Sequence, residues 1–185
     1  MPVLAAEPSV YPATLLEMPP VGESDQQWWV LHCRARQEKA LARRLFDSQI
    51  PFYLPTIDRR FRLRGRTITS HVPLFPGYVF LLGNREQRLG ALTTNRVVRT
   101  LPVGNQDALW SDLRQVYQLI ASGAPITPEE RLSPGVSVEI RSGPLAGLKG
   151  KILRTASGRR FVVEVDFIQQ GASVLLEDYC LTTAD

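Results

Sequence analysis

The chain has 185 residues and a formal net charge of +4 at pH 7, with an isoelectric point near 9.4. This length allows one ordinary domain or two small ones, and a composition of 44% hydrophobic and 22% charged residues is that of a globular protein. Because no apolar run approaches the length of a membrane span and no disulfide-rich pattern is present, we expect a cytoplasmic protein without a membrane partner.

The first segment, residues 1–27, is predicted to be a flexible leader. It holds five prolines and lacks the basic start and the long apolar core of a secretory signal. The two cysteines, Cys33 and Cys180, lie far apart in the sequence and show no disulfide spacing. We expect both to be reduced thiols.

Hydrophobic periodicity predicts an α+β chain whose N-terminal domain, residues 28–121, has an antiparallel sheet and flanking helices. The run 28–33 (WWVLHC) is apolar and partly β-branched, which is typical of a buried strand. Leu41 and Leu45 lie one turn apart on the same face of an amphipathic helix. In chain order we expect strands at 28–33, 52–54, 73–82 and 97–101, and helices at 38–49 and 107–121.

Residues 58–70 are predicted to form a protruding hairpin. Five arginines surround Gly65 in this stretch, and apolar residues are few. Arginine that no acid neutralises attracts phosphate through counterion release. Arg62, Arg64 and Arg66 are therefore candidate nucleic-acid contacts.

A second group of basic side chains falls on or near the first helix. The acids in this part of the chain are sparse, and the basic charge is local while the rest of the sequence is close to neutral. We interpret the group as a surface for a nucleic-acid backbone; the alternative is a solvated face that keeps the protein in solution. Its members are Arg34, Arg36, Lys39, Arg43 and Arg44.

Residues 73–80 (PLFPGYVF) combine a rigid backbone with aromatic rings. Two prolines enclose Phe75, and Gly77 permits a bend that a Cβ would oppose. Alternation along a strand buries some of the rings and exposes others. An exposed ring here would anchor a protein partner, whereas the alternative is packing of the core.

Beyond the second helix the pattern changes. Residues 122–133 are predicted to be a linker because prolines and glycines interrupt the periodicity. Residues 134–185 then alternate apolar and polar positions in short runs, which predicts a small SH3-like β-barrel. Between two of its strands the segment 143–150 (GPLAGLKG) predicts a tight turn of structural role, built on Gly143, Gly147 and Gly150.

We assign no residue to catalysis, to a metal or to a cofactor. Cys33 follows His32 on a predicted strand, so their side chains point to opposite faces. The sequence holds no CxxC, no HxxxH and no carboxylate cluster with ligand spacing. We therefore predict a protein that acts by binding and is not an enzyme; an enzyme using Cys33 or His71 is the alternative.

Taken together, the segments resemble the NusG family of transcription elongation factors. Residues 28–31 (WWVL) resemble the opening strand of the family's N-terminal domain, and Glu38 falls where the family commonly carries a glutamate. Residues 73–80 are similar to the most recognisable segment of that domain. Residues 143–152 resemble the KOW motif of the C-terminal barrel, and the two motifs occur in the family's order.

The resemblance implies a monomer that docks on the clamp helices of RNA polymerase and suppresses pausing or termination. Family contacts to the polymerase fall on positions that here are Phe75, Pro76 and Tyr78. The KOW barrel would recruit a second factor, either a small-subunit ribosomal protein or the Rho terminator, through a surface that includes Phe167 and Ile168.

Within the family the chain resembles specialised paralogues of the RfaH type. Such paralogues contact the non-template DNA strand with a basic surface, which is matched here by Arg34, Gln37, Arg43 and Arg44. The glycine-rich KOW turn differs from RfaH and argues against a C-terminal domain that switches to helix. The alternative function is a KOW-type module that binds RNA or the ribosome without binding polymerase.

Overall fold

The computed structural model describes residues 7–17, 19, 25–131, 133–156, 158–176 and 181–183. It divides the chain into two compact units, Met1–Gln106 and Asp107–Asp185. Across the described residues it is a mixed fold of three α-helices and antiparallel sheets, so the predicted mixture of helices and strands is confirmed. Cys180 lies outside the described residues.

The N-terminal unit is built on a five-stranded sheet with the strand order β1-β3-β6-β2-β7. All of its neighbouring strands are antiparallel. This result confirms the expected strands at the start of the domain and before its last helix. The strands are β1 (Val10–Tyr11), β2 (Gln27–Cys33), β3 (Phe52–Tyr53), β6 (Tyr78–Gly83) and β7 (Val97–Pro102).

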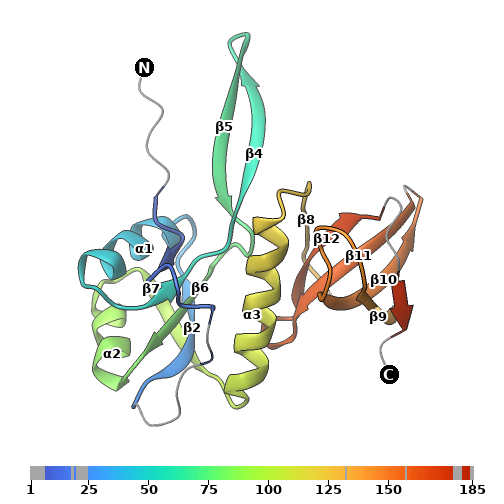
Figure 1. Ribbon diagram of the computed structural model, residues 1–185. Helices are drawn as coiled ribbons and strands as arrows, with labels where there is room; N and C mark the ends of the chain where they lie inside the picture. The colour runs from blue at the N-terminus through green and yellow to red at the C-terminus, as the bar shows by residue number, and fades with distance from the viewer. Residues whose placement is uncertain are drawn as a thin grey trace. The chain divides into compact units, whose positions relative to one another are not determined.

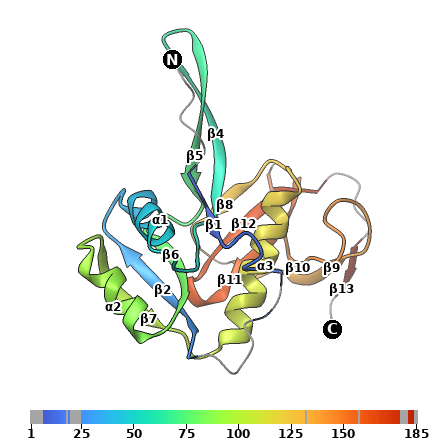
Figure 2. The ribbon, with the colours of Figure 1, turned by 60° about the vertical axis from the view of Figure 1, so that its left-hand side comes forward.

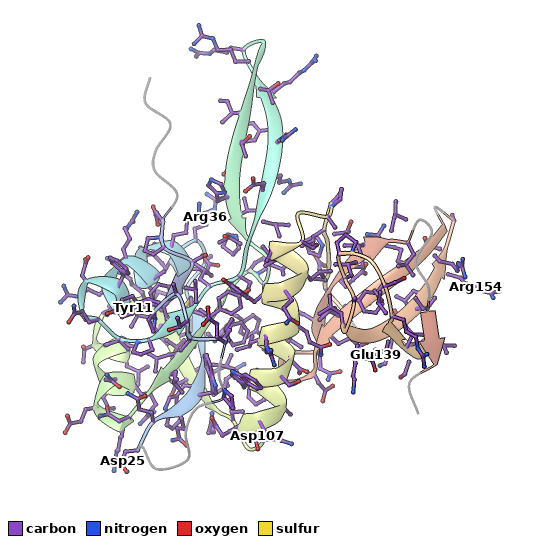
Figure 3. The ribbon with its side chains drawn as sticks, in the orientation of Figure 1. Tyr11, Asp25, Arg36, Asp107, Glu139 and Arg154 are labelled. Atoms are coloured by element: carbon purple, nitrogen blue, oxygen red, sulfur yellow. The ribbon has the colours of Figure 1, made fainter. Side chains whose placement is uncertain are left out.

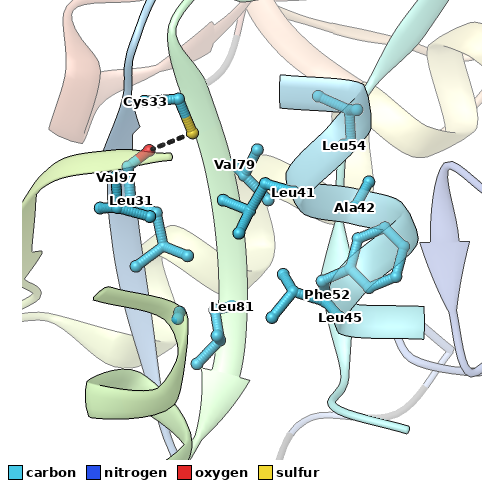
Figure 4. Close-up of a cluster of buried hydrophobic side chains, with 11 residues drawn as sticks. Leu31, Cys33, Leu41, Ala42, Leu45, Phe52, Leu54, Val79, Leu81 and Val97 are labelled. Atoms are coloured by element: carbon cyan, nitrogen blue, oxygen red, sulfur yellow. Dashed lines mark hydrogen bonds between the residues drawn. The ribbon is translucent and has the colours of Figure 1, made fainter. Parts of the chain in front are cut away.

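Two helices cover one face of this sheet, α1 (Glu38–Asp47) and α2 (Arg85–Thr93). Leu41 and Leu45 of α1 pack against Leu31 and Leu81 in a single buried cluster, which Figure 4 shows at close range. Burying a leucine side chain contributes roughly 1.5–3 kcal/mol. The apolar stripe of α1 thus fixes the helix on the sheet.

Helix α2 was not predicted from the sequence. Asn84 is its N-cap: the Asn84 side chain accepts a hydrogen bond from Gln87 N at 2.9 Å, and Gln87 Oε1 accepts one from Asn84 N at 2.9 Å. This reciprocal pair is a capping box. Because it satisfies two free donors at the helix start, it stabilises a helix that buries only Ala91.

Strand β1 lies inside the range that we interpreted as a flexible leader. Val10 and Tyr11 pair with Tyr53 and Phe52, and the ring of Tyr11 packs edge-on against Phe46 with centroids 5.3 Å apart. Backbone pairing and an aromatic contact therefore hold this part of the segment against the sheet.

The predicted hairpin is confirmed as the pair β4 (Thr56–Leu63) and β5 (Arg66–Pro73). It extends away from the sheet of the N-terminal unit, as Figure 1 and Figure 2 show from two sides. Arg64 and Gly65 connect the strands with φ values of 47° and 79°. Left-handed conformations at both central residues are typical of a type I′ turn, whose twist suits a two-stranded ribbon.

The strand predicted at 73–82 is shorter than expected. Pro73 ends β5, and β6 begins only at Tyr78. Between them Gly77 adopts a φ of +86°, a left-handed conformation that glycine takes without strain. The bend expected at Gly77 is thus confirmed, and it interrupts the strand.

The C-terminal unit contains nearly all of α3 (Gln106–Ala121), a 3₁₀ turn η1 (Asp166–Ile168) and a six-stranded antiparallel sheet. Over the described residues this sheet is open: its edge strands β13 and β8 each have one neighbour, and no closed barrel is seen. The alternating runs do form strands, as predicted. In sheet order the strands are β13 (Leu181–Thr183), β9 (Val136–Ile140), β10 (Lys149–Thr155), β11 (Gly158–Val165), β12 (Gln170–Leu175) and β8 (Thr127–Glu129).

Candidate functional site

A groove of about 710 Å³ lies where the end of β2 meets the start of α1 and the foot of the hairpin. Arg34, Arg36 and Lys39 give its walls positive charge, while Pro73 and Val98 contribute apolar surface. Figure 3 shows Arg36 close to the base of β4 and β5. The groove therefore combines a cationic rim with an apolar floor.

Glu38 holds the groove in shape. Its side chain is 6% exposed, and its Oε1 accepts a hydrogen bond of 2.7 Å from Gly77 N. In the same place Cys33 N donates to Gly77 O at 2.7 Å. The first turn of α1 and the end of β2 are thereby fastened to the turn that precedes β6.

Two rings lie beside this turn. The ring centroids of His32 and Tyr78 are 5.4 Å apart, and the position of a Cβ on Gly77 would lie 3.7 Å from the His32 ring. His32 Nδ1 is buried without a hydrogen-bond partner among the described residues. A flat ring at the wall of a cationic groove suits a ligand that has both a planar apolar part and a negative charge.

Cys33 is no nucleophile in this setting. It is a buried free thiol, and burial, together with the negative charge of Glu38, raises its pKa to about 12. A thiol with such a pKa stays protonated near neutral pH, and only the thiolate is reactive. Over the described residues, no group of three or more His, Cys, Asp or Glu side chains comes together to hold a metal.

The predicted nucleic-acid residues near α1 fall into two sets. Arg34 lines the groove, and Gln37 lies next to it in the sequence between the groove residues Arg36 and Glu38. Arg34 Nη2 donates to Asn95 Oδ1 at 2.8 Å, and Gln37 Oε1 accepts from Arg96 Nη1 at 2.6 Å. Arg96 therefore joins the basic surface, although it lies 59 positions from Gln37. No local pattern in the sequence indicates this contact.

Arg43 and Arg44 form the second set, farther along α1. Arg43 Nη1 donates to Glu7 Oε1 at 2.5 Å in an exposed ion pair. Exposed pairs contribute little, about 0–1 kcal/mol, so Glu7 holds Arg43 only weakly. Arg44 is exposed and lines a smaller pocket between α1 and α2.

The hairpin arginines Arg62, Arg64 and Arg66 are all exposed on β4, on the turn and on β5. The hairpin begins at the groove, because Pro73 is both the last residue of β5 and part of the groove wall. Positive charge thus continues from the groove along the hairpin within the N-terminal unit.

The three residues predicted to contact polymerase differ in exposure. Phe75 is only 1% exposed, and its ring packs edge-on against Phe80 with centroids 6.4 Å apart. Pro76 is exposed and Tyr78 is half-buried. In this conformation a partner can reach Pro76 and Tyr78, whereas the buried ring of Phe75 packs beneath the turn.

In the C-terminal unit the predicted glycine turn has the required geometry. Gly143 and Gly147 have φ values of 89° and 86°. At Gly150 an added Cβ would lie 2.2 Å from Val162 O and 2.9 Å from the Phe161 ring. Each of these glycines is therefore needed for a left-handed turn or for close contact between strands.

The predicted partner surface lies on η1 in the same unit. Phe167 is 37% exposed and Ile168 is half-buried. Beside them the carboxylate of Asp112 accepts a hydrogen bond from Asp166 N at 3.1 Å. The pKa of Asp112 is raised to about 6, chiefly by burial. The hydrogen bond from Asp166 N opposes this increase, and the negative charge of Asp166 adds to it.

The chain matches one family model and is similar to several solved structures. Residues 26–130 match the family model described as "Transcription termination factor nusG". Among solved structures the chain is similar to Thermotoga maritima NusG, in a study of its domain interaction, with 18% identity over 81% of this chain and 93% of that chain and a TM-score of 0.47. It is also similar to the MjSpt4:Spt5 complex in conformation B, with 16% identity, coverage of 85% and 97%, and a TM-score of 0.26. A search of curated proteins gave no match.

Proposed function

Because the chain belongs to the NusG family, whose members are transcription factors and not enzymes, we propose that it acts in transcription elongation by binding RNA polymerase. The observation that carries this proposal is the family match over residues 26–130. Bound to polymerase, the protein suppresses pausing or termination. Among the described residues no helix has the length and apolar character needed to cross a membrane.

The N-terminal unit binds the clamp helices of the polymerase through Pro76 and Tyr78. The exposure of Pro76 and the half-exposure of Tyr78 support this assignment. Phe75 contributes by holding the turn, since its buried ring packs on Phe80. Two prolines and the hydrogen bond from Gly77 N to Glu38 keep this surface rigid, which lowers the entropy lost on binding.

The groove and the basic face of α1 bind the non-template DNA strand. Arg34 and Gln37 act at the groove, and Arg43 and Arg44 extend the surface. Released counterions favour this contact and make it dependent on salt. The ring of His32 in the groove wall supports single-stranded DNA in particular, because an unpaired base can stack there.

The C-terminal unit recruits a second factor. We propose a KOW domain of the SH3-like barrel type over residues 134–185, joined through the segment 122–133 to a polymerase-binding domain at 28–121. Within that segment β8 pairs with β12 of the KOW domain. Its partner is a small-subunit ribosomal protein or Rho, bound at Phe167 and Ile168. The glycine geometry of the turn at Gly143 and Gly147 supports the KOW assignment.

We further propose an operon-specific role of the RfaH type, in which the basic surface selects certain DNA sequences. The alternative is a module that binds RNA or the ribosome without polymerase. The two functions differ in one property, which is affinity for core RNA polymerase.

Pull-down of core RNA polymerase by the purified chain distinguishes these functions. The wild-type protein is expected to retain polymerase, and Tyr78→Ala is expected to weaken binding by about 1–2 kcal/mol, which is five- to thirtyfold. Leu89→Ala is the matched control, because Leu89 is a 44% exposed apolar side chain on α2 outside this surface. Absence of polymerase binding together with affinity for structured RNA would establish the alternative.

A further inference from the structure

The two faces of the hairpin β4–β5 carry different chemistry. Side chains alternate between the faces of a strand, and directly paired residues share a face. Phe61 pairs with Ile68, and Ile57 pairs with Val72. These four residues make this face largely apolar, although Arg59, Ser70 and Arg66 share it. On it Phe61 is 45% and Ile68 is 37% exposed.

The opposite face is basic and rich in hydroxyl groups. Arg60 pairs with Thr69 and Arg62 pairs with Thr67, and all four side chains are exposed. We call these four residues the arginine–threonine face. Two arginines thus lie side by side along β4, and two threonines lie beside them along β5.

One acid, Asp58, lies on the same face as Arg60 and Arg62, and it is paired with His71. The only acid between Thr56 and Pro73 is Asp58, and its carboxylate is 2.5 Å from His71 Nδ1. Within the part of the chain that the structure describes, no ion pair involves Arg60 or Arg62. The arginine–threonine face is therefore available to an anionic partner with hydrogen-bond acceptors.

We propose that the hairpin enters the major groove of duplex DNA and presents its arginine–threonine face to the base edges. The major groove of B-DNA is about 12 Å wide and admits a two-stranded ribbon. Arginine donates two hydrogen bonds to guanine, one to O6 and one to N7, and threonine forms hydrogen bonds with several bases. Arg64 and Arg66 at the tip then lie near the phosphates.

Other nucleic acids fit this face less well. A-form RNA has a major groove too narrow for side chains to read. Single strands are held by stacking on aromatic rings, whereas Phe61 lies on the other face of the hairpin and the ring of His71 is paired with Asp58. The inference rests on the proposed function, and it adds duplex DNA as the partner of the hairpin beside the single strand at the groove.

The test compares two DNA duplexes of identical guanine-rich sequence, one of which carries 7-deazaguanine in place of guanine. The replacement removes the N7 acceptor from the major groove and leaves the phosphates unchanged. Binding of the full chain is measured by fluorescence anisotropy at low salt. The wild-type protein is expected to bind the natural duplex roughly tenfold more tightly.

Variants show which face is responsible. The Arg60→Ala/Arg62→Ala protein is expected to bind both duplexes equally. Arg59→Ala is the matched control, because Arg59 is an exposed arginine of the same strand that pairs with Ser70 on the apolar face. The Arg59→Ala protein loses one charge and is expected to bind both duplexes more weakly, but to keep the preference for natural guanine.

Equal binding of the wild-type protein to the two duplexes, or no binding to duplex at low salt, would overturn the proposal. So would loss of the preference in Arg59→Ala, since that result would indicate attraction by charge alone. Pull-down of core polymerase on the same preparations separates the two proposals. The Arg60→Ala/Arg62→Ala protein is expected to retain polymerase, while failure of the wild-type protein to bind polymerase would contradict only the proposed function.

Discussion

Glu38 is expected to be the side chain on which the shape of the groove depends most. It is 6% exposed, and its carboxylate accepts the 2.7 Å hydrogen bond from Gly77 N. We consider two substitutions at this position. Glu38→Gln keeps an acceptor and removes the charge, whereas Glu38→Ala removes both.

The two substitutions differ in expected cost. A hydrogen bond to a charged group contributes about 1.5–3 kcal/mol, and a buried N–H left without a partner costs about 1–3 kcal/mol. These terms overlap, so Glu38→Ala is expected to destabilise the N-terminal unit by about 3 kcal/mol. Glu38→Gln removes the negative charge, which interacts favourably with the helix dipole at the N-terminus of α1, and is expected to destabilise the unit by about 1 kcal/mol.

Urea unfolding followed by tryptophan fluorescence measures these values. The chain has three tryptophans, and a Trp110→Phe background leaves only Trp28 and Trp29 of β2, which report on the N-terminal unit. A Glu38→Ala midpoint equal to that of the background protein would refute this reasoning. Equal losses in Glu38→Gln and Glu38→Ala would show that charge, and not the hydrogen bond, is responsible.

Two further predictions concern the C-terminal unit and the chain's response to pH. Gly150→Ala forces a Cβ to within 2.2 Å of Val162 O and is expected to destabilise that unit by about 3 kcal/mol. The control is Gly104→Ala, whose Cβ meets nothing within 4 Å and which is expected to change stability by less than about 0.5 kcal/mol. Both variants are measured by urea unfolding, and equal unfolding midpoints would contradict the prediction. Asp112 has a folded pKa of about 6 against an ordinary 3.8, so the folded state holds its proton more tightly and stability falls as pH rises through this interval. Asp112→Asn is therefore expected to be more stable than wild type above about pH 6, by about 1 kcal/mol after allowance for solvent screening, and equal to it below about pH 4; a difference that does not vary with pH would contradict the assignment.

Local patterns in the sequence predicted much of the fold. The apolar run at the start of β2, the stripe on α1 and the arginines around Gly65 each produced the expected element. Helix α2 was missed because its apolar periodicity is weak. The start of that helix was nevertheless readable, since Asn84 followed three residues later by Gln87 is the signature of a capping box.

Contacts between distant segments were not predictable in this way. The bond between Arg96 and Gln37 spans 59 positions, and the pairing of β1 with β3 depends on a tertiary surface. The arginine–threonine face follows only from the register that pairs Arg62 with Thr67. A shift of one residue would place these side chains on opposite faces, so composition alone indicates a basic hairpin and no more.

The central claim, that this chain is an elongation factor that binds polymerase, is tested most directly by single-round transcription with purified RNA polymerase. Elongation is followed with and without the protein on templates that differ in their non-template sequence, and Tyr78→Ala serves as the comparison. We predict shorter pauses with the wild-type protein and a smaller effect with Tyr78→Ala. Unchanged pausing on every template, together with no binding to polymerase, would contradict the account.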